Sequence, residues 1–109
     1  MRTEVHFTHM DRSEALESLA LEKFEGIVEE FLHRDESHVQ IWLVNEKSHG
    51  QKGEHQFKCE VSVRYPPKKE IFVNKTATDM HDAINMTAST LMQLLRDESK
   101  KEIKKKHGH

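Results

Sequence analysis

The chain has little of what marks secreted, membrane or disulfide-stapled proteins. It holds one cysteine in 109 residues, so an internal disulfide is excluded. No run of about eighteen apolar residues occurs, so nothing in the chain spans a membrane. The N-terminus lacks the apolar stretch of a signal peptide. Proline and glycine are scarce, and the two prolines stand together at residues 66–67. We therefore expect a cytoplasmic protein that has no membrane partner.

The composition and length of the chain predict one small packed domain. Apolar residues make up 35% of the chain and charged residues 33%, which indicates a core with a heavily solvated surface. A chain of this length buries a single modest core. Cys59 lies in an alternating apolar run, which favours a buried small hydrophobe over a catalytic thiol. We assign residues 1–99 to the domain and residues 100–109 to a basic, frayed extension of its last helix.

The net charge of −2 conceals a gradient along the chain. Residues 11–34 hold seven acidic and three basic side chains, whereas residues 96–109 hold six basic and three acidic ones. This asymmetry predicts a charged surface at one end of the molecule that attracts partners of opposite charge. Two interpretations of the lysine-rich end stay open. It binds phosphates by counterion release, or its lysines offset a helix macrodipole and solubilise a frayed end.

The first part of the chain predicts a strand followed by a helix. Residues 5–7 alternate in polarity, as a short strand does. The helix begins with a capping box that joins Asp11 to Glu14, or with Ser13 as the cap. Gly26 lies inside the helix and should weaken it by about 1 kcal/mol relative to alanine. The apolar stripe of the helix is Leu16, Leu19, Ala20, Phe24, Ile27, Val28, Phe31 and Leu32.

Three strands and a second helix are predicted after it. Val39, Ile41 and Leu43 mark the next strand, and residues 45–54, with two glycines, are typical of a loop. The prolines end the following strand, because proline cannot donate to a ladder. Residues 70–75 form the last strand. The inward residues of the longer strand are Phe57, Cys59, Val61, Val63 and Tyr65.

The second helix should begin near Thr78 or Asp79. Its inward stripe is Met80, Ala83, Ile84, Thr87, Ala88, Leu91, Leu94 and Leu95. The order of elements is then βαβββα. It predicts an α+β two-layer sandwich, with a four-stranded, mostly antiparallel sheet and both helices on one face.

The spacing of reactive residues does not favour an enzyme or a metal protein. Glu60 and Glu70 lie on neighbouring strands, but outward glutamates of an antiparallel sheet are usually solvated. No nucleophile elbow or glycine-rich phosphate loop occurs, so we expect no catalysis, cofactor or small-molecule substrate. The nine histidines lack the spacing and cysteine neighbours of a zinc site. Only adventitious metal binding is expected, at His107 and His109.

Trp42 falls on the strand face opposite the inward residues, together with Val44. Three interpretations stay open. The indole packs over neighbouring strands against the stems of Arg64 or Lys58. Alternatively, it forms a platform on which bases stack or partners dock. It could also join two copies of the chain as a weak homodimer through the sheet face.

Two short motifs carry a resemblance to a known family. Residues 13–16, Ser-Glu-Ala-Leu, are similar to a Thr-Glu-Ala-Leu helix start, and Lys23-Phe24 follows at the expected place. Residues 79–85, Asp-Met-His-Asp-Ala-Ile-Asn, are similar to Asp-Met-Tyr-x-Ala-Ile-Asn/Asp. With the order of elements, these motifs resemble the short ribosome hibernation-promoting factor and ribosome-associated inhibitor A family, also called sigma-54 modulation proteins. The resemblance covers almost the whole chain.

The resemblance implies a non-enzymatic protein with a fold similar to a double-stranded-RNA-binding domain. It implies binding to the small ribosomal subunit, in the channel for messenger and transfer RNA, where the protein blocks initiation and preserves idle ribosomes. Basic side chains on both helices would contact ribosomal RNA phosphates. The usual basic positions of the second helix fall here on Thr90, Gln93 and Asp97. The predicted phosphate contacts are Lys23, Lys75, Arg96, Lys100, Lys101 and Lys104.

A rival hypothesis starts from the acids of the first helix. Glu17, Glu22, Glu25 and Glu29 would make this helix an acidic surface suited to a basic partner, such as a ribosomal protein. In that case the chain has lost its RNA affinity and acts by protein–protein contact.

Overall fold

The computed structural model describes residues 1–32, 37–47, 55–66 and 68–107; for residues 47, 55 and 101–107 it describes the backbone alone. The observed order of elements is βαβββα, as predicted. The elements are β1 (Arg2–Thr8), α1 (Glu14–Leu32), β2 (His38–Lys47), β3 (His55–Tyr65), β4 (Lys69–Ala77) and α2 (Met80–His107). None of the helices in these residues is both long and apolar enough to cross a membrane.

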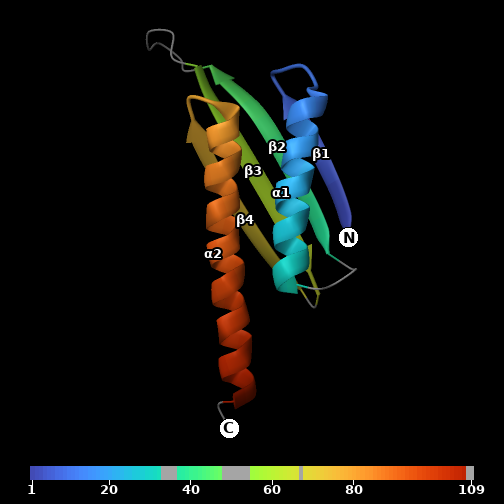
Figure 1. Ribbon diagram of the computed structural model, residues 1–109, viewed down its shortest axis with the longest axis vertical. Helices are drawn as coiled ribbons and strands as arrows, with labels where there is room; N and C mark the ends of the chain where they lie inside the picture. Colours follow the sequence, from blue (N-terminus) through green and yellow to red (C-terminus); the bar gives the residue numbers. More distant parts are fainter. Residues whose placement is uncertain (33–36, 48–54, 67, 108–109) are drawn as a thin grey trace.

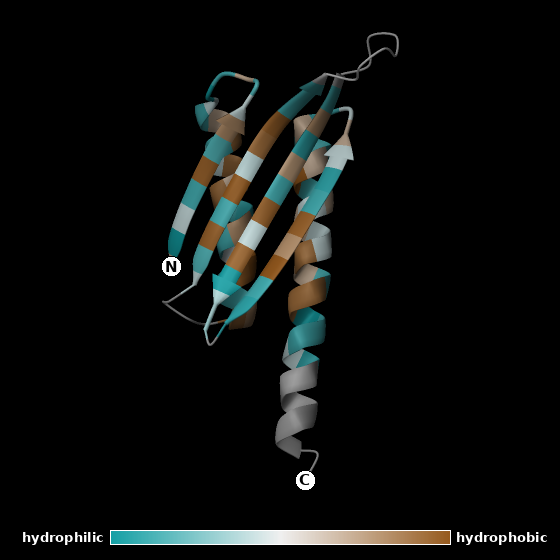
Figure 2. Ribbon diagram, turned by 180° about the vertical axis from the view of Figure 1, so that it is seen from behind, coloured by the Kyte–Doolittle hydropathy of each residue, from teal (hydrophilic) through white to brown (hydrophobic). Residues whose placement is uncertain are grey.

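The strands form a single sheet in the order β1-β2-β3-β4. β1 runs parallel to β2, while β2 with β3 and β3 with β4 are antiparallel. Both helices lie on one face, α1 over β1 and β2, and α2 over β3 and β4 (Figure 1). The other face carries no helix (Figure 2). The predicted α+β sandwich with a mostly antiparallel sheet is confirmed.

The core lies between the sheet and the two helices. Its largest fully buried side chains include Phe24 from α1, Ile41 and Leu43 from β2, and Leu91 and Leu95 from α2. Burying one such side chain contributes about 1.5–3 kcal/mol. The predicted stripes of both helices supply this core, with the exception described next.

Of the side chains predicted to point inward, Leu94 is partly exposed and Cys59 is fully buried. Leu94 is not part of the core, because its side chain is 38% exposed. Successive residues are about 100° apart around a helix, so burial of Leu95 turns Leu94 to the flank. Cys59 is fully buried as predicted, and burial raises the pKa of its thiol to about 12. The thiolate that a reactive cysteine requires is therefore disfavoured.

The helix caps decide between the alternatives that the sequence left open. Ser13 caps α1, because its Oγ accepts a hydrogen bond from the Leu16 amide (3.2 Å). The predicted capping box of Asp11 and Glu14 is wrong, since Glu14 is already the first helical residue. Asp79 caps α2, where its Oδ1 accepts a hydrogen bond from the amide of His81 at 2.8 Å.

The hairpin between β2 and β3 is longer than the sequence indicated. Residues 45–47, predicted as loop, continue β2 and pair with residues 55–57 of β3. The rest of the predicted loop, residues 48–54, lies outside the described residues. An ion pair across the two strands, Lys58 Nζ to Glu46 Oε1 at 2.7 Å, accompanies this extension. The extra pairing extends β2 to Lys47, although the alternation of apolar residues in the sequence stops at Val44.

α2 runs beyond the sheet. Lys69 Nζ, at the start of β4, contacts Glu98 Oε2 of α2 at 3.1 Å. The helix continues from Glu98 to His107, nine more residues or about 13 Å, past the sheet (Figure 1). The predicted boundary at residues 99 and 100 therefore falls within a continuous helix, and the extension as a separate unit stays a prediction.

Candidate nucleic-acid interface

The outer face of α2 brings two of the predicted phosphate contacts together. Arg96 and Lys100 are both exposed and lie four residues apart, so they share one face of the helix. Because Leu91 and Leu95 are fully buried toward the sheet, this basic face turns to solvent. Neither Arg96 nor Lys100 forms an ion pair with another side chain that the structure describes.

Lys101 and Lys104 belong to the projecting part of α2. The helical backbone runs through both and ends at His107. Helical spacing places Lys104 on the same face as Lys100, one turn later, and Lys101 about 100° away from Lys100. We call Arg96, Lys100 and Lys104 the basic stripe.

Lys23 lies apart from the basic stripe. It is half-buried in α1, nine residues after the helix begins, whereas Arg96 comes sixteen residues after the start of α2. Both helices begin at the same end of the sheet (Figure 1). At about 1.5 Å per residue, Arg96 lies about 10 Å further along its helix than Lys23 does.

Lys75 is further still from the stripe. It pairs with Cys59 on the helix-facing side of the sheet and is partly buried. The carbonyl oxygen of Cys59 accepts a hydrogen bond from Thr87 Oγ1 at 3.1 Å, which fixes this level along α2. Nine residues, or about 13 Å of helix, separate Thr87 from Arg96, the first residue of the basic stripe. A phosphate group bound by the basic stripe is therefore too far along the helix to contact Lys75 as well.

α1 is acidic along its length. Six glutamates and one lysine give it a charge of −5. Glu22, Glu29 and Glu30 are exposed, and no basic residue occupies the last turn. Because a helix C-terminus carries partial negative charge, the glutamates of the last turn are unfavourable there. Lys23 is thus the one base of α1 that a phosphate strand could contact.

On the open sheet face, ion pairs occupy several charged groups. Glu4 Oε2 accepts hydrogen bonds from Gln40 Nε2 (2.9 Å) and His38 Nε2 (3.1 Å). These bonds, that of Gln40 first, lower the pKa of Glu4. Arg2 also lies 3.6 Å from the Glu4 carboxylate. The basic groups at this end of the face, Arg2 and His38, therefore lie against the Glu4 carboxylate.

The same matching occurs around Lys58 on β3. Its Nζ lies 2.7 Å from Glu46 Oε1 and 3.0 Å from Glu60 Oε1. Both carboxylates, Glu46 first, raise the pKa of Lys58 by stabilising its charged form. Arg64 lies 3.6 Å from Glu70 in the same way. The open face therefore offers phosphate less free positive charge than the outer face of α2.

Trp42 lies on the open face as predicted, because Ile41 and Leu43 on either side of it are fully buried. Its ring partner is His6 of β1, which was not anticipated. The ring centroids are 5.7 Å apart and the planes differ by 24°. The parallel register of β1 and β2 pairs His6 with Trp42. No local signal in the sequence indicates this pair, because it depends on which strands are neighbours.

Fold and charge together define a class of protein: a two-layer βαβββα domain with a bare sheet face and a basic helix end. Two solved structures share this fold. A ribosomal subunit interface protein from Coxiella burnetii aligns with a TM-score of 0.72 and 20% identity, over 90% of this chain and 97% of that one. The N-terminal domain of Protein Y from Thermus thermophilus aligns with a TM-score of 0.70 and 15% identity, over 89% and 98%.

The family is shown by the sequence itself. Residues 3–103 match the family model of the sigma 54 modulation protein / S30EA ribosomal protein, and the chain belongs to this family. The resemblance that the two motifs indicated is thereby confirmed. This is a family of ribosome-associated factors and not a class of enzymes. Among curated proteins, none matches the chain.

Proposed function

We propose that this protein binds the small ribosomal subunit through its RNA, in the channel for messenger and transfer RNA, and silences translation by occupying that channel. It would do so in the cytoplasm and without catalysis. The family match over residues 3–103 carries this proposal. The basic stripe supplies the chemistry, because it places positive charge on a projecting, solvent-facing helix.

The expected binding energy comes mainly from counterion release. Each phosphate neutralised on a duplex contributes about −0.9 to the slope of log K against log salt, and about −0.7 on a single strand. Three contacts from the basic stripe therefore predict a slope of about −2 to −3. Lys23, Lys75 and Lys101 are proposed as additional contacts, each adding less than one unit. Such binding is salt-sensitive.

The shape of the domain suggests how occupancy would work. The sheet and two helices form a compact wedge around a buried core. A wedge held by its basic end excludes messenger and transfer RNA by volume alone. No hydrolysis or covalent change is required by this mechanism.

A charge-reversal series tests the proposal. The triple variant Arg96→Glu, Lys100→Glu and Lys104→Glu should lose co-sedimentation with purified small subunits, and its salt slope should flatten by about 2–3. The matched control reverses Arg2, Arg64 and Lys68, which are exposed and lie off α2. Both triples change the net charge equally, so the control separates local contact from overall charge. Circular dichroism verifies that both variants remain folded.

Three outcomes are informative. Loss of binding in the stripe variant alone supports the proposal. Equal losses in both triples would mean that net charge, and not this stripe, determines binding. Unchanged binding in the stripe variant would refute the assignment of Arg96, Lys100 and Lys104. Single reversals of Lys23, Lys75 and Lys101 then rank the remaining predicted contacts.

The acidic face of α1 supports a second candidate function, binding of a basic protein. Of the four glutamates first suggested for it, two are already engaged. Glu17 accepts from Arg12 Nε at 2.8 Å, and Glu25 accepts from Thr3 Oγ1 at 2.8 Å. Glu22 and Glu29 are exposed, and Glu30 joins them. Tight binding to a ribosomal protein without any binding to naked ribosomal RNA would favour this function over the first.

A further inference from the structure

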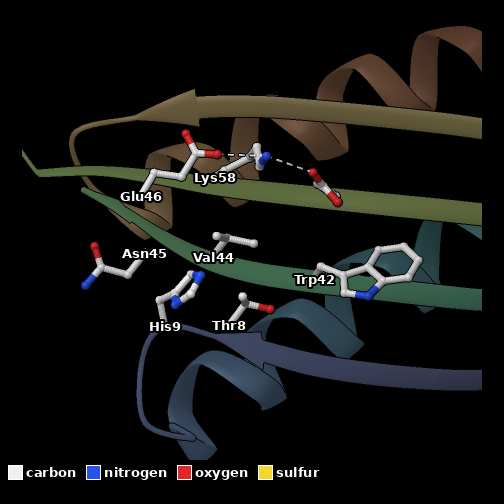
Figure 3. Close-up of a pocket in the computed structure, with 8 residues that line it drawn as sticks. Thr8, His9, Trp42, Val44, Asn45, Glu46 and Lys58 are labelled. Carbon is white, nitrogen blue, oxygen red and sulfur yellow. Dashed lines mark ion pairs between the residues drawn. The ribbon is translucent and has the colours of Figure 1, made fainter. Parts of the chain in front are cut away.

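A corner of the open sheet face is hollow because β1 is shorter than β2. The pairing of the two strands ends at Thr8 and Val44, whereas β2 continues beside β3 to Lys47. His9 then turns the chain away toward α1, with a φ of 58° in the left-handed region that few side chains adopt. The unpaired end of β2 leaves a depression of about 940 Å³ (Figure 3).

The walls of the depression differ in chemistry. Trp42 lies toward one end and His9 toward the other, with Val44 between them (Figure 3). Lys58 and the carboxylates of its ion pairs run along the β3 side. A planar aromatic surface thus adjoins a row of hydrogen-bonding groups. Ligand sites commonly combine an apolar wall with a few fixed polar groups, in volumes of roughly 300–1,000 Å³.

The turn after β1 adds a second feature to the depression. His9 lines it with a left-handed backbone, and uncommon backbone conformations of this kind cluster at ligand-binding positions (Figure 3). Thr8 brings a hydroxyl group to the same end.

The charge of the depression limits what it can bind. Glu46 and Glu60 face a single lysine, so the formal charge is −1 with neutral histidine. Phosphate is therefore not the anchor. Carboxylates accept hydrogen bonds from the exocyclic amino and ring N–H groups of nucleobases, and indole stacks on any base. Sugar hydroxyls match the donors and acceptors at the other end, Thr8 and His9.

We propose that this depression binds a nucleoside unit, with the base near Glu60 on the side of the Trp42 indole that His6 does not cover, and the ribose toward Thr8 and His9. The nucleoside comes either from a free nucleotide or from an unpaired base of an RNA strand. The site lies on the sheet face that carries no helix, the face seen in Figure 2, whereas the basic stripe lies on α2. The nucleoside proposal can therefore be tested independently of the proposed ribosome contact.

Trp42 is the single tryptophan of the chain, so its fluorescence reports on this site alone. The titration uses the full chain, excitation at the red edge of indole absorption, and three ligands: guanosine monophosphate, ribose 5-phosphate and a single-stranded hexanucleotide. Saturable quenching by the nucleotide, without quenching by ribose 5-phosphate, supports a site for free nucleotides. Quenching by the hexanucleotide alone supports an unpaired base of a strand. No quenching by either, or equal quenching by ribose 5-phosphate, overturns the proposal.

A pair of matched variants adds a second criterion. Glu60→Gln removes a carboxylate from the depression and should weaken the nucleoside affinity about tenfold, the effect of losing one hydrogen bond to a charged group. Glu70→Gln alters a carboxylate on the same face, also ion-paired, but outside the depression. Its affinity should stay within about twofold of the parent. Equal effects of the two variants would also overturn the proposal.

Discussion

Gly26 is the residue of α1 whose substitution gives the most direct stability test. It is exposed in the middle of the helix, and a Cβ built on it meets nothing within 4 Å. Alanine there creates no clash and restricts the unfolded chain, so the full difference in helix propensity should appear. That difference is about 0.8–1 kcal/mol per residue. We expect Gly26→Ala to raise the free energy of unfolding by about 1 kcal/mol.

Equilibrium unfolding in urea measures this gain. For an m-value of about 1–1.5 kcal/mol/M, a gain of 1 kcal/mol moves the midpoint by about 0.7–1 M, and in a thermal scan by about 4 °C. Helix ellipticity and Trp42 fluorescence should give the same midpoint if unfolding is two-state. Ser18→Gly, at another exposed position of α1, serves as the reciprocal control and should lower the midpoint.

The result that would refute this reasoning is equally definite. A midpoint that stays constant or falls in Gly26→Ala, while Ser18→Gly behaves as expected, would mean that α1 is not helical at residue 26 or that a neighbour occupies the space. A changed m-value would instead indicate an altered denatured state.

Three further predictions concern the cap, the thiol and the face of α2. Ser13→Ala should cost about 1 kcal/mol in urea unfolding, whereas Asp11→Ala should cost less than about 0.5 kcal/mol, because Ser13 makes the capping bond. Burial raises the folded-state pKa of Cys59 to about 12 from 9.0, so its contribution is complete below pH 9 and is lost between pH 9 and 12. Stability should fall by up to about 1.4 kcal/mol per pH unit there, and a Cys59→Ala variant should lack this part of the slope. Leu95→Ala should cost about 2–5 kcal/mol and Leu94→Ala below about 1 kcal/mol, since Leu95 is fully buried and Leu94 is 38% exposed.

The architecture was predictable because burial follows a local period. Leu91 and Leu95 repeat at a helical step, and Ile41 and Leu43 alternate as in a strand, so their inward direction can be seen in the sequence. Positions at the border of a stripe are less certain. Leu94 continues the apolar pattern, yet it lies outside the core because the adjacent Leu95 is the residue that turns to the sheet.

Features that depend on strand register were not predictable. The contact of His6 with Trp42 exists because β1 pairs in parallel with β2, and nothing near either residue indicates that pairing. The ion pair of Lys58 with Glu46 likewise requires the hairpin to continue past the predicted strand end. The hollow corner follows from the same extension. A site that depends on distant neighbours is visible only once the sheet is assembled.

The basic residues show the same division between local and distant order. Arg96 and Lys100 lie four residues apart, so their common face could be deduced from helix geometry alone. Whether Lys23 or Lys75 joins them depends on where each element sits relative to α2. The structure separates both from Arg96, the first residue of the stripe, by about 10 Å along the helices for Lys23 and about 13 Å for the level of Lys75. Their role as phosphate contacts stays a prediction.

Separation along α2 also explains how a chain of net charge −2 could hold a polyanion. Charges more than a Debye length apart, about 8 Å at physiological salt, scarcely affect one another at a protein surface. The helix runs about 13 Å past Glu98, whose carboxylate pairs with Lys69 of β4, and residues 99–107 hold five lysines and one glutamate. The positive charge of this end would therefore act largely apart from the acidic residues of α1. On the proposed function, the protein would approach RNA with this end first and keep the acidic face of α1 turned away.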